Sequence, residues 1–271
     1  MVAKLLLVGG GKMGEALLRG LLRAGWARPE ELVVSEVSEA RRAQLTAEEA
    51  LAGVQVVGGE PAPADGAVLA VKPADVEGAC RALTSRASLR RVLSIAAGVR
   101  LADLEAWCAP GTAVIRAMPN TPALVAAAAT AISAGPAASA EDMEWACDIM
   151  RAVGTVVEVP EDQLDAVTGL SGSGPAYLFL VAEAMTEAGV LVGLPRTVAA
   201  SLVAQTLLGS GRLLAETGQS PQALRAAVTS PGGTTAAGLR QLEASAARAA
   251  FIEAVAAAVR RSRELARGVP G

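Results

Sequence analysis

The chain has 271 residues, which is enough for two domains of ordinary size or for one large domain with a substantial core. Its formal net charge of −3 and pI of about 5.3 provide no basic surface, so nucleic acid is not expected as a partner. Hydrophobic residues make up 52% of the chain, but alanine accounts for much of this, and the longest apolar stretches, 123–129 and 176–182, are too short to span a bilayer. The apolar run from Leu5 leads into a glycine turn rather than a leader cleavage site, so we expect a soluble, cytoplasmic protein without a membrane partner.

Histidine is absent from the chain, which excludes Ser-His-Asp and Cys-His catalysis and the common zinc sites. The cysteines, Cys80, Cys108 and Cys147, are odd in number and widely spaced, so they indicate neither a disulfide framework nor a metal site. We expect reduced packing thiols and no metal. Any chemistry must proceed without an imidazole.

A glycine turn, Gly9-Gly10-Gly11-Lys12-Met13-Gly14, follows the first predicted strand at residues 5–8 and precedes a helical stretch. This is the layout of a dinucleotide-binding βαβ unit: Gly9 permits a tight turn, Gly11 lets the backbone approach a pyrophosphate, and Gly14 lets helix and strand pack closely. The phosphates would lie on the N–H groups of the helix start. A glycine-rich loop in another kind of α/β protein is the alternative, which the strand before and the helix after make less favoured.

The second predicted strand, residues 31–37, ends where such folds bind the adenosine ribose. An acidic residue there accepts the 2′-hydroxyl of NAD, and Glu36 occupies this place about 20 residues after the glycines. Ser35, Ser38 and the pair Arg41-Arg42 lie nearby and would hold a phosphate if Glu36 turned away. The alternative is that Glu36 only caps or solvates the loop.

Three further strands are predicted at residues 54–57, 66–71 and 91–96, separated by alanine-rich stretches with helical spacing. Such alternation favours a parallel sheet covered on both faces, with ligands outside the carboxyl ends of the strands. The loops of interest are therefore Val71-Lys72-Pro73 and Ala96-Ala97-Gly98. Lys72 is either a cation beside the crevice or an ordinary solvated lysine.

The next strand, residues 112–116, leads into a loop in which two prolines bracket Asn120 and Thr121 and restrict its geometry. Two more strands at 131–134 and 155–159 enclose a helix at 139–153. From Pro160 onward the pattern is entirely helical, which predicts two domains, 1–159 and 160–271.

The second half predicts a helix from about Pro175 to Val190, a second from Pro195 to about Glu216, one after Pro221 and a last one at about 247–266. With two Phe and one Tyr in the chain, packing must come from Ala, Val and Leu. Helices this apolar favour burial against another subunit, so we expect a homodimer formed by the helical domain.

Small residues and hydroxyls surround a predicted helix start at Ser230-Pro231-Gly232-Gly233-Thr234-Thr235. Backbone N–H groups and the positive end of the helix dipole make this a candidate carboxylate site. The alternative is a plain loop in which Ser230 or Thr234 is the N-cap. Beside a nucleotide domain, the loop supplies a place for a small anionic substrate.

In this order, the motifs resemble those of pyrroline-5-carboxylate reductase, the enzyme family of the last step of proline synthesis. The resemblance covers essentially the whole chain, and residues 228–235 are its most specific part. The matching segments are 9–14, 71–73, 94–98, 116–122, 166–177 and 228–235.

This resemblance implies an α/β protein with an N-terminal Rossmann-type dinucleotide-binding domain and an all-α C-terminal dimerisation domain, whose dimers often assemble further into a decamer of five dimers. It implies hydride transfer from NADPH or NADH to the imine of 1-pyrroline-5-carboxylate, with Thr235 as the catalytic residue near the ring nitrogen. With Ser35 and Glu36 from the second strand, the expected cofactor residues are Gly9, Gly11, Lys12, Met13, Gly14, Val71, Lys72, Pro73, Ala96, Ala97, Gly98 and Asn120. The expected substrate residues are Ala97, Ser230, Gly232, Gly233, Thr234 and Thr235.

One departure concerns the coenzyme, because many family members carry Asn-Arg where this chain has Glu36-Val37, and the preference between NADPH and NADH stays open. A β-hydroxyacid dehydrogenase has the same two-domain plan but needs a lysine in the helical domain, whereas the lysines here are Lys4, Lys12 and Lys72. A nucleotide-sensing module without catalysis is a further alternative, which the complete Ser230 to Thr235 loop disfavours.

Overall fold

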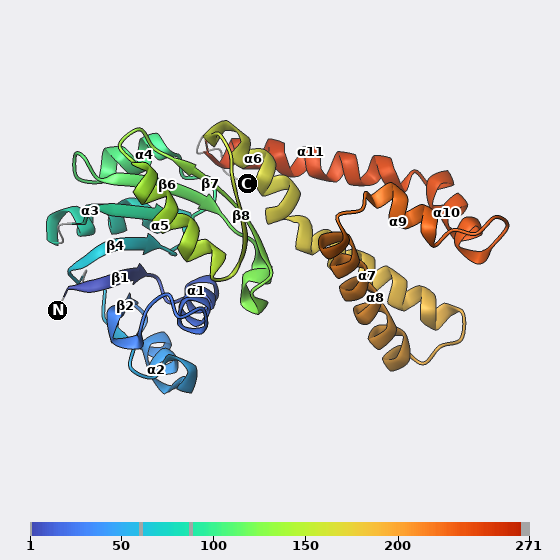
Figure 1. Cartoon of the computed structure of the whole chain (residues 1–271), viewed down its shortest axis with the longest axis horizontal. Coiled ribbons are helices and arrows are strands. Elements are labelled where there is room, and N and C mark those ends of the chain that lie inside the picture. The colour runs from blue at the N-terminus through green and yellow to red at the C-terminus, as the bar shows by residue number, and fades with distance from the viewer. Residues whose placement is uncertain (1, 60–61, 87–88, 267–271) are drawn as a thin grey trace. The chain divides into compact units, whose positions relative to one another are not determined.

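A computed structural model describes residues 2–59, 62–86 and 89–266 (Figure 1). It divides into two compact units, one containing residues up to Ser173 together with the end of helix α11 from Ala258, and the other Gly174–Ala257. Among the described residues, β8 is the last strand and ends at Glu158, so the change to helices alone lies where the sequence predicts it. The division by compactness comes later, at residues 173 and 174.

In the described residues, the first unit contains an eight-stranded sheet with the order β3-β2-β1-β4-β5-β6-β7-β8. Neighbouring strands are parallel, as predicted for the strands up to β5, except β6 and β7, which pair antiparallel. The connection between them is short and contains the 3-10 turn η4 (Thr121–Val125) in place of the crossover helix that parallel strands need. The strands are β1 Ala3–Val8, β2 Leu32–Ser35, β3 Gln55–Val57, β4 Ala64–Leu69, β5 Arg91–Ser94, β6 Ala113–Met118, β7 Ala128–Ala134 and β8 Gly154–Glu158.

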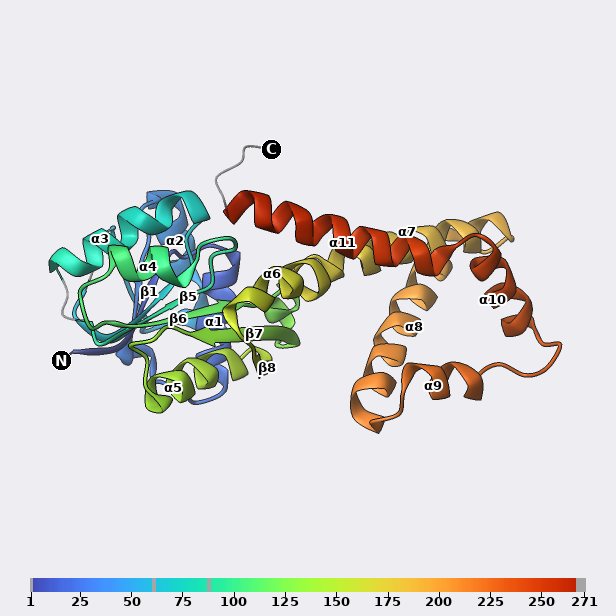
Figure 2. The same ribbon diagram turned by 90° about the horizontal axis from the view of Figure 1, so that it is seen from above.

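Helices cover both faces of this sheet, as Figure 2 shows for α3 and α4 on one side and α5 on the other. The helices of the first unit are α1 Lys12–Arg23, α2 Glu39–Ala47, α3 Val76–Arg86, α4 Leu101–Trp107, α5 Ala140–Arg151 and the short α6 Leu164–Val167. A π-helical turn, η6 (Thr168–Gly172), follows α6.

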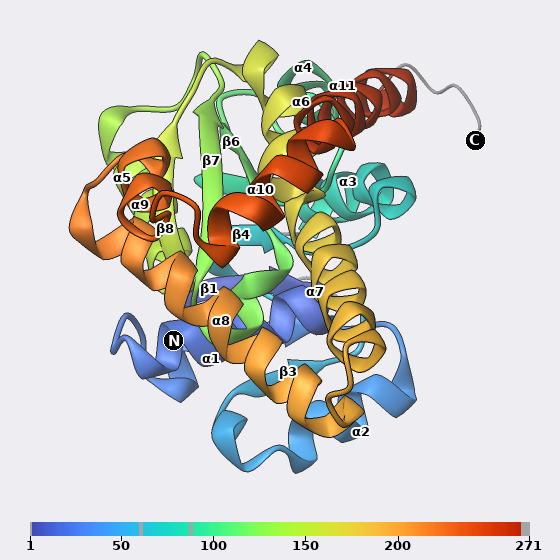
Figure 3. The same cartoon turned by 90° about the vertical axis from the view of Figure 1, so that its right-hand side faces the viewer.

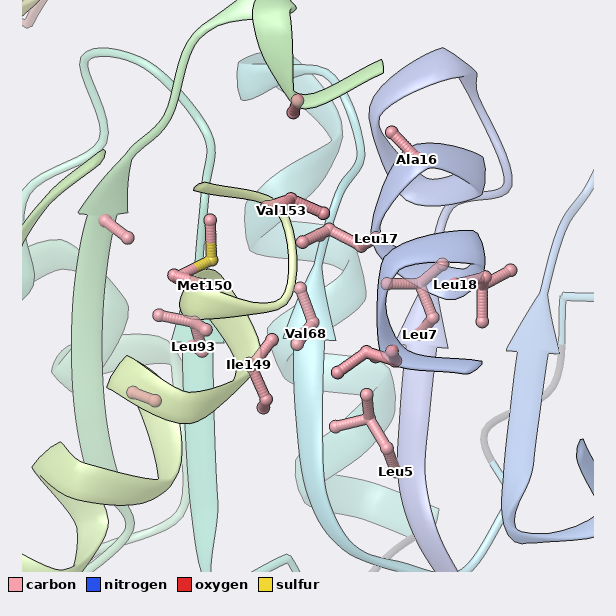
Figure 4. Packing of buried hydrophobic residues seen from close by; sticks show 14 of the residues in the cluster. Leu5, Leu7, Ala16, Leu17, Leu18, Val68, Leu93, Ile149, Met150 and Val153 are labelled. Atoms are coloured by element: carbon pink, nitrogen blue, oxygen red, sulfur yellow. The ribbon is translucent and has the colours of Figure 1, made fainter. Parts of the chain in front are cut away.

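The continuous apolar run of β1 is explained by this double covering. Leu5 and Leu7 belong to the cluster under α1 and α5, whereas Leu6 belongs to the cluster under α3 and α4, and all three side chains are 0% exposed. Figure 4 shows Leu17 of α1 and Ile149 of α5 packed in the first cluster. Alternate residues of a strand point to opposite faces, so a strand buried on both faces must be apolar throughout.

The predicted packing thiols are all free. Cys80 and Cys147 are buried in the two clusters, and Cys108 is half-buried beside the α3 and α4 cluster. Burial raises the pKa of the Cys147 thiol, which keeps it protonated.

The second unit is built from helices, which Figure 3 presents face on. Its helices are α7 Gly174–Leu191, α8 Arg196–Thr217, α9 Pro221–Ala227, α10 Thr234–Ala244 and the first part of α11 Ala247–Ala266. The bounds of α8 and α11 follow the predicted ones closely. Many large apolar side chains on these helices are exposed, including Phe179, Leu202 and Ile252. By length and composition alone α8 is also long and apolar enough to cross a membrane, with 11% of its most apolar window buried.

Helix α1 crosses β1 at Gly14, where no side chain fits. A Cβ at Gly14 would lie 2.2 Å from the backbone oxygen of Gly9 and 3.0 Å from Leu7 Cδ2. The third glycine of the turn therefore permits the close helix and strand packing that the motif predicts. Gly11, by contrast, has nothing within 4 Å of such a Cβ.

We expect Gly14→Ala to lower the free energy of unfolding by about 1–3 kcal/mol, because the Gly9 oxygen is backbone and cannot move away alone. Urea unfolding at one fixed protein concentration measures this. The control, Gly11→Ala, should cost about 0.5 kcal/mol, the difference between glycine and alanine at an N-cap. Equal losses for the two variants would contradict the packing argument.

Candidate active site

The glycine turn presents an open helix start at the carboxyl end of β1. Gly9 has a φ of +102°, and a Cβ there would lie 2.7 Å from the backbone oxygen of Ala70, so the tight turn requires glycine. Helix α1 begins at Lys12 after the N-cap Gly11, which has no side-chain cap. The first N–H groups of α1 are thus left for an anion, and the space beside Gly11 lets one approach.

The carboxylate of Glu36 is fixed beside this turn. Its Oε2 accepts a hydrogen bond from Gly10 N at 2.8 Å, and its Oε1 accepts from Ser38 N at 2.8 Å. Ser35, the preceding residue, is buried, and its carbonyl accepts from Gly9 N at 2.9 Å. Glu36 therefore fastens its own loop and also holds a negative charge at the end of β2, next to the glycines.

The two arginines that the sequence offers as phosphate ligands are already engaged. Arg41 donates from Nε to Gly10 O at 2.6 Å and forms an ion pair of 2.5 Å with Glu15. The Arg41 guanidinium, and Arg19 after it, hold the pKa of the Glu15 carboxyl below its usual value despite partial burial. Arg42 donates to the backbone oxygens of Glu36 and Val37 at 2.9 and 2.8 Å.

A crevice of about 310 Å³ opens at the carboxyl ends of the central strands. It brings together predicted residues from four loops: Met13, Val71, Pro73, Ala96, Ala97 and Asn120. Gly98 lines an adjoining cavity of about 620 Å³ within the same unit. Lys12 and Lys72 are exposed and line neither space, so the structure does not bring the predicted Lys72 cation into the crevice.

Sequence reasoning missed part of the crevice wall. Met118 lines it from the end of β6, and Gly172 lines it from the π-helical turn η6, 54 positions later in the chain. A Cβ at Gly172 would lie 2.8 Å from Met118 Cε, so the turn and the strand end pack closely. The sequence signal for Gly172 is the Ser171-Gly172-Ser173-Gly174 run, which lies within the matching segment 166–177 and precedes the predicted helix at Pro175.

The side chain of Asn120 is used within the protein. It is 9% exposed, its Nδ2 donates to Ser171 O at 3.0 Å, and its Oδ1 accepts from Ala129 N at 3.0 Å. The side chain of Asn120 thus joins the loop after β6 to β7 and to the π-helical turn η6, and the residue also lines the crevice.

In the second unit, the Ser230 to Thr235 loop forms another open helix start. Gly232 has a φ of +70°, and α10 begins after the N-cap Gly233, which has no side-chain cap. The alternative that Ser230 or Thr234 is the N-cap is therefore wrong. A Cβ at Gly233 would lie 2.4 Å from Ser230 Oγ, so the Ser230 side chain would have to move to admit one.

The hydroxyls of this loop are available to a ligand. Among the described residues, those of Ser230, Thr234 and Thr235 have no hydrogen-bond partner, and all three residues are exposed. By contrast, Thr206 and Thr229 donate to the carbonyl four residues earlier. Backbone N–H groups and free hydroxyls together suit a small carboxylate.

Comparison with known proteins agrees with both halves of this arrangement. Residues 161–265 match the family described as pyrroline-5-carboxylate reductase dimerisation, and residues 4–98 match the family described as NADP oxidoreductase coenzyme F420-dependent. The pyrroline-5-carboxylate reductase of Synechocystis is 45% identical over 268 residues, covering 98% of this chain and 99% of the relative. That of Methanosarcina acetivorans is 44% identical over 262 residues, covering 95% and 96%.

Solved structures give the same result. The pyrroline-5-carboxylate reductase of Coxiella burnetii superimposes with a TM-score of 0.88 at 38% identity, covering 98% of this chain and 99% of that one. The pyrroline carboxylate reductase of Plasmodium falciparum, solved with NADP bound, has a TM-score of 0.81 at 29% identity, covering 97% and 98%. Relatives above 40% identity over nearly the full length, together with this fold, show that the chain belongs to the pyrroline-5-carboxylate reductase family.

Proposed function

We propose that this protein reduces 1-pyrroline-5-carboxylate to L-proline with NADH or NADPH as the hydride donor, the last step of proline synthesis. The observation that carries the proposal is that one chain holds two open helix starts with glycine N-caps, α1 beside the crevice and α10 in the helical unit. The pyrophosphate of a dinucleotide and a small carboxylate are anions of the kind that such a helix start binds. The family relationship supplies the identity of the substrate.

The first unit would hold the coenzyme. Its pyrophosphate fits the first turn of α1, since Gly11 leaves the space that a phosphate needs. Its nicotinamide half fits the crevice, which lies at the carboxyl ends of the strands, where ligands of such sheets bind. When bound, the coenzyme supplies the hydride. The proposed contacts are Gly9, Gly11, Lys12, Met13, Gly14, Ser35, Glu36, Val71, Lys72, Pro73, Ala96, Ala97, Gly98 and Asn120.

The α10 loop would hold the substrate. The N–H groups near Gly232 and Gly233 suit its carboxylate, and the Thr235 hydroxyl suits the ring nitrogen. Ala97, Ser230 and Thr234 complete the proposed contacts. An imine that binds already protonated accepts a hydride without a strong acid from the protein, so the residues here bind and orient, and the absence of histidine from the sequence is no obstacle.

We expect Thr235→Ala to lower kcat/KM for pyrroline-5-carboxylate by on the order of tenfold or more, because it removes a hydrogen bond made to the reacting ring. Coenzyme affinity should stay unchanged. Thr235→Ser, which keeps the hydroxyl, should retain most of the activity. NAD(P)H oxidation measured at 340 nm checks both variants, and an unchanged kcat/KM in Thr235→Ala removes Thr235 from the mechanism. The same assay on the unaltered chain tests the alternative of a nucleotide sensor, which would bind coenzyme without turnover.

The environment of Glu36 favours NADH. Its fixed carboxylate accepts a 2′-hydroxyl but repels a 2′-phosphate, and the nearby arginines, Arg41 and Arg42, already have partners. We expect Glu36→Ala to raise the ratio of kcat/KM for NADPH to that for NADH by about tenfold, since removal of the carboxylate ends its repulsion of the 2′-phosphate and its hydrogen bond to the 2′-hydroxyl. Glu36→Gln removes the charge but keeps an acceptor for Gly10 N, and should shift the ratio in the same direction. A ratio unchanged in both variants would show that Glu36 does not face the ribose.

The helical unit would form the homodimer. Residues 161–265 match a dimerisation family, and exposed apolar side chains on α7 and α8, such as Leu178, Phe179 and Leu202, need a covering surface. The membrane-like composition of α8 fits burial against a second copy, consistent with a cytoplasmic protein. Further assembly of five dimers into a decamer is part of the same proposal.

We expect sedimentation equilibrium to give a mass of at least twice the 27.2 kDa of one chain. Leu202→Glu should shift the protein toward the monomer, because it places a charge on the apolar face of α8. Gln222→Glu, on an exposed position of α9, is the matched control for the added charge and should leave the mass unchanged. A monomer in the unaltered chain would refute the dimer.

A further inference from the structure

Asn120 is the only asparagine in the chain, and its amide satisfies backbone groups of two other segments. Its Oδ1 accepts from Ala129 N, and its Nδ2 donates to Ser171 O, both at 3.0 Å. The residue is 9% exposed, so neither bond is readily replaced by water. Each of these two backbone groups lacks its ordinary partner for a reason visible in the chain.

The first group, Ala129 N, lacks a backbone acceptor because the ladder between β6 and β7 ends there. Gly135 N donates to Val114 O in this ladder, and in an antiparallel pair such bonded pairs recur every second residue. Residues 120 and 129 would therefore form a bonded pair in the same register. The carbonyl of Asn120 instead accepts from Ala123 N at 3.1 Å, as η4 begins. The side-chain oxygen of Asn120 takes the place of that carbonyl for Ala129 N.

The second group, the carbonyl oxygen of Ser171, lacks a helical donor because of a proline. In an α-helix the carbonyl of Ser171 would accept from the N–H of residue 175, and Pro175 has none. The chain forms the π-helical turn η6 (Thr168–Gly172) here, in which Ser173 N donates to Thr168 O at 2.8 Å. The amide N–H of Asn120 supplies the donor that Pro175 lacks.

This second bond holds one wall of the crevice. Gly172, next to Ser171, lines the same crevice as Ala96 and Ala97. Gly172 also packs so closely on Met118 that a Cβ would lie 2.8 Å from its Cε. Without the Asn120 bond, the π-helical turn loses a side-chain hydrogen bond that joins it to the β6 loop. The position of Gly172 in the crevice wall is then less firmly fixed.

We propose that the side-chain amide of Asn120 has a positioning role, in which its N–H sets the crevice wall at Ser171 and Gly172, so that the coenzyme contact proposed for Asn120 is made by its backbone. The role rests on the proposed reductase function, because the crevice is where the nicotinamide would be oriented for transfer. A small displacement of an orienting wall lowers the rate of the chemical step more than it lowers ground-state binding.

Asn120→Asp tests this, because the variant can donate to Ser171 O only when its carboxyl is protonated. Burial and the facing carbonyl oxygen of Ser171 both raise the pKa of the introduced aspartate, and we expect them to outweigh the single N–H of Ala129, which lowers it. We expect kcat relative to the unaltered chain to be about tenfold lower at pH 8.5 and to recover to within about threefold at pH 6. Asn120→Ala has no donor at any pH, and its relative kcat should be low and flat.

Two further measurements distinguish a positioning role of the Asn120 amide from direct contact with the coenzyme. The Kd of NADH, from its fluorescence, should change by less than about twofold in Asn120→Asp at either pH. The melting temperature of Asn120→Asp relative to the unaltered chain should fall as pH rises, since a folded-state pKa above the unfolded value stabilises only below it. Gln55→Glu makes the same amide-to-acid change at an exposed position of β3 and should show neither effect.

Several outcomes would overturn the inference. A relative kcat of Asn120→Asp that does not change with pH would show that the bond to Ser171 O does not set the rate. A large rise in the NADH Kd would show that the amide contacts the coenzyme instead. No turnover by the unaltered chain would refute the proposed function, whereas loss of the pH effect with normal turnover refutes only the role of Asn120.

Discussion

Unpaired backbone groups at the carboxyl edge of the sheet decide what each loop of the first unit can do. Some are closed by side chains: Glu36 accepts from Gly10 N, and Asn120 donates to Ser171 O. The first turn of α1 is left open, because its N-cap, Gly11, has no side chain to close it. Backbone groups that are hydrogen-bonded to side chains hold the loops in place, whereas the unpaired N–H groups at the start of α1 attract an anion. The paired groups fix the loops that line the crevice, and the unpaired groups leave a place for an anion beside it.

The same device recurs in α10, where Gly233 is the N-cap and the first turn is again open. Backbone dipoles do not titrate near neutral pH, so anions held in this way need no charged side chain. This is consistent with a chain that contains no histidine, and in which Lys12 and Lys72 lie outside the two cavities at the edge of the sheet. In the proposed reaction the protein contributes orientation, and the coenzyme contributes the chemistry.

The two units differ in how they bury apolar surface. The sheet of the first unit encloses its leucines and valines from both sides, whereas α7 and α8 leave residues such as Phe179 and Leu202 exposed. Residues 161–265, which include these helices, match a dimerisation family, and the proposed homodimer would cover this surface. An alanine-rich composition suits such helices, because small side chains allow close approach between helices.

The sequence by itself determined the glycine turn, the position of Glu36 after β2 and the change to helices near residue 160, because apolar runs, glycines and prolines act on their immediate neighbours. Only the tertiary structure decided that β7 runs antiparallel to β6, that Arg41 is held by Glu15, and that the amide of Asn120 faces Ser171. Arg41 and Glu15 are 26 positions apart in the chain, and Asn120 and Ser171 are 51 positions apart. Partners at such separations are set by how strands and turns meet in space, which no local pattern records.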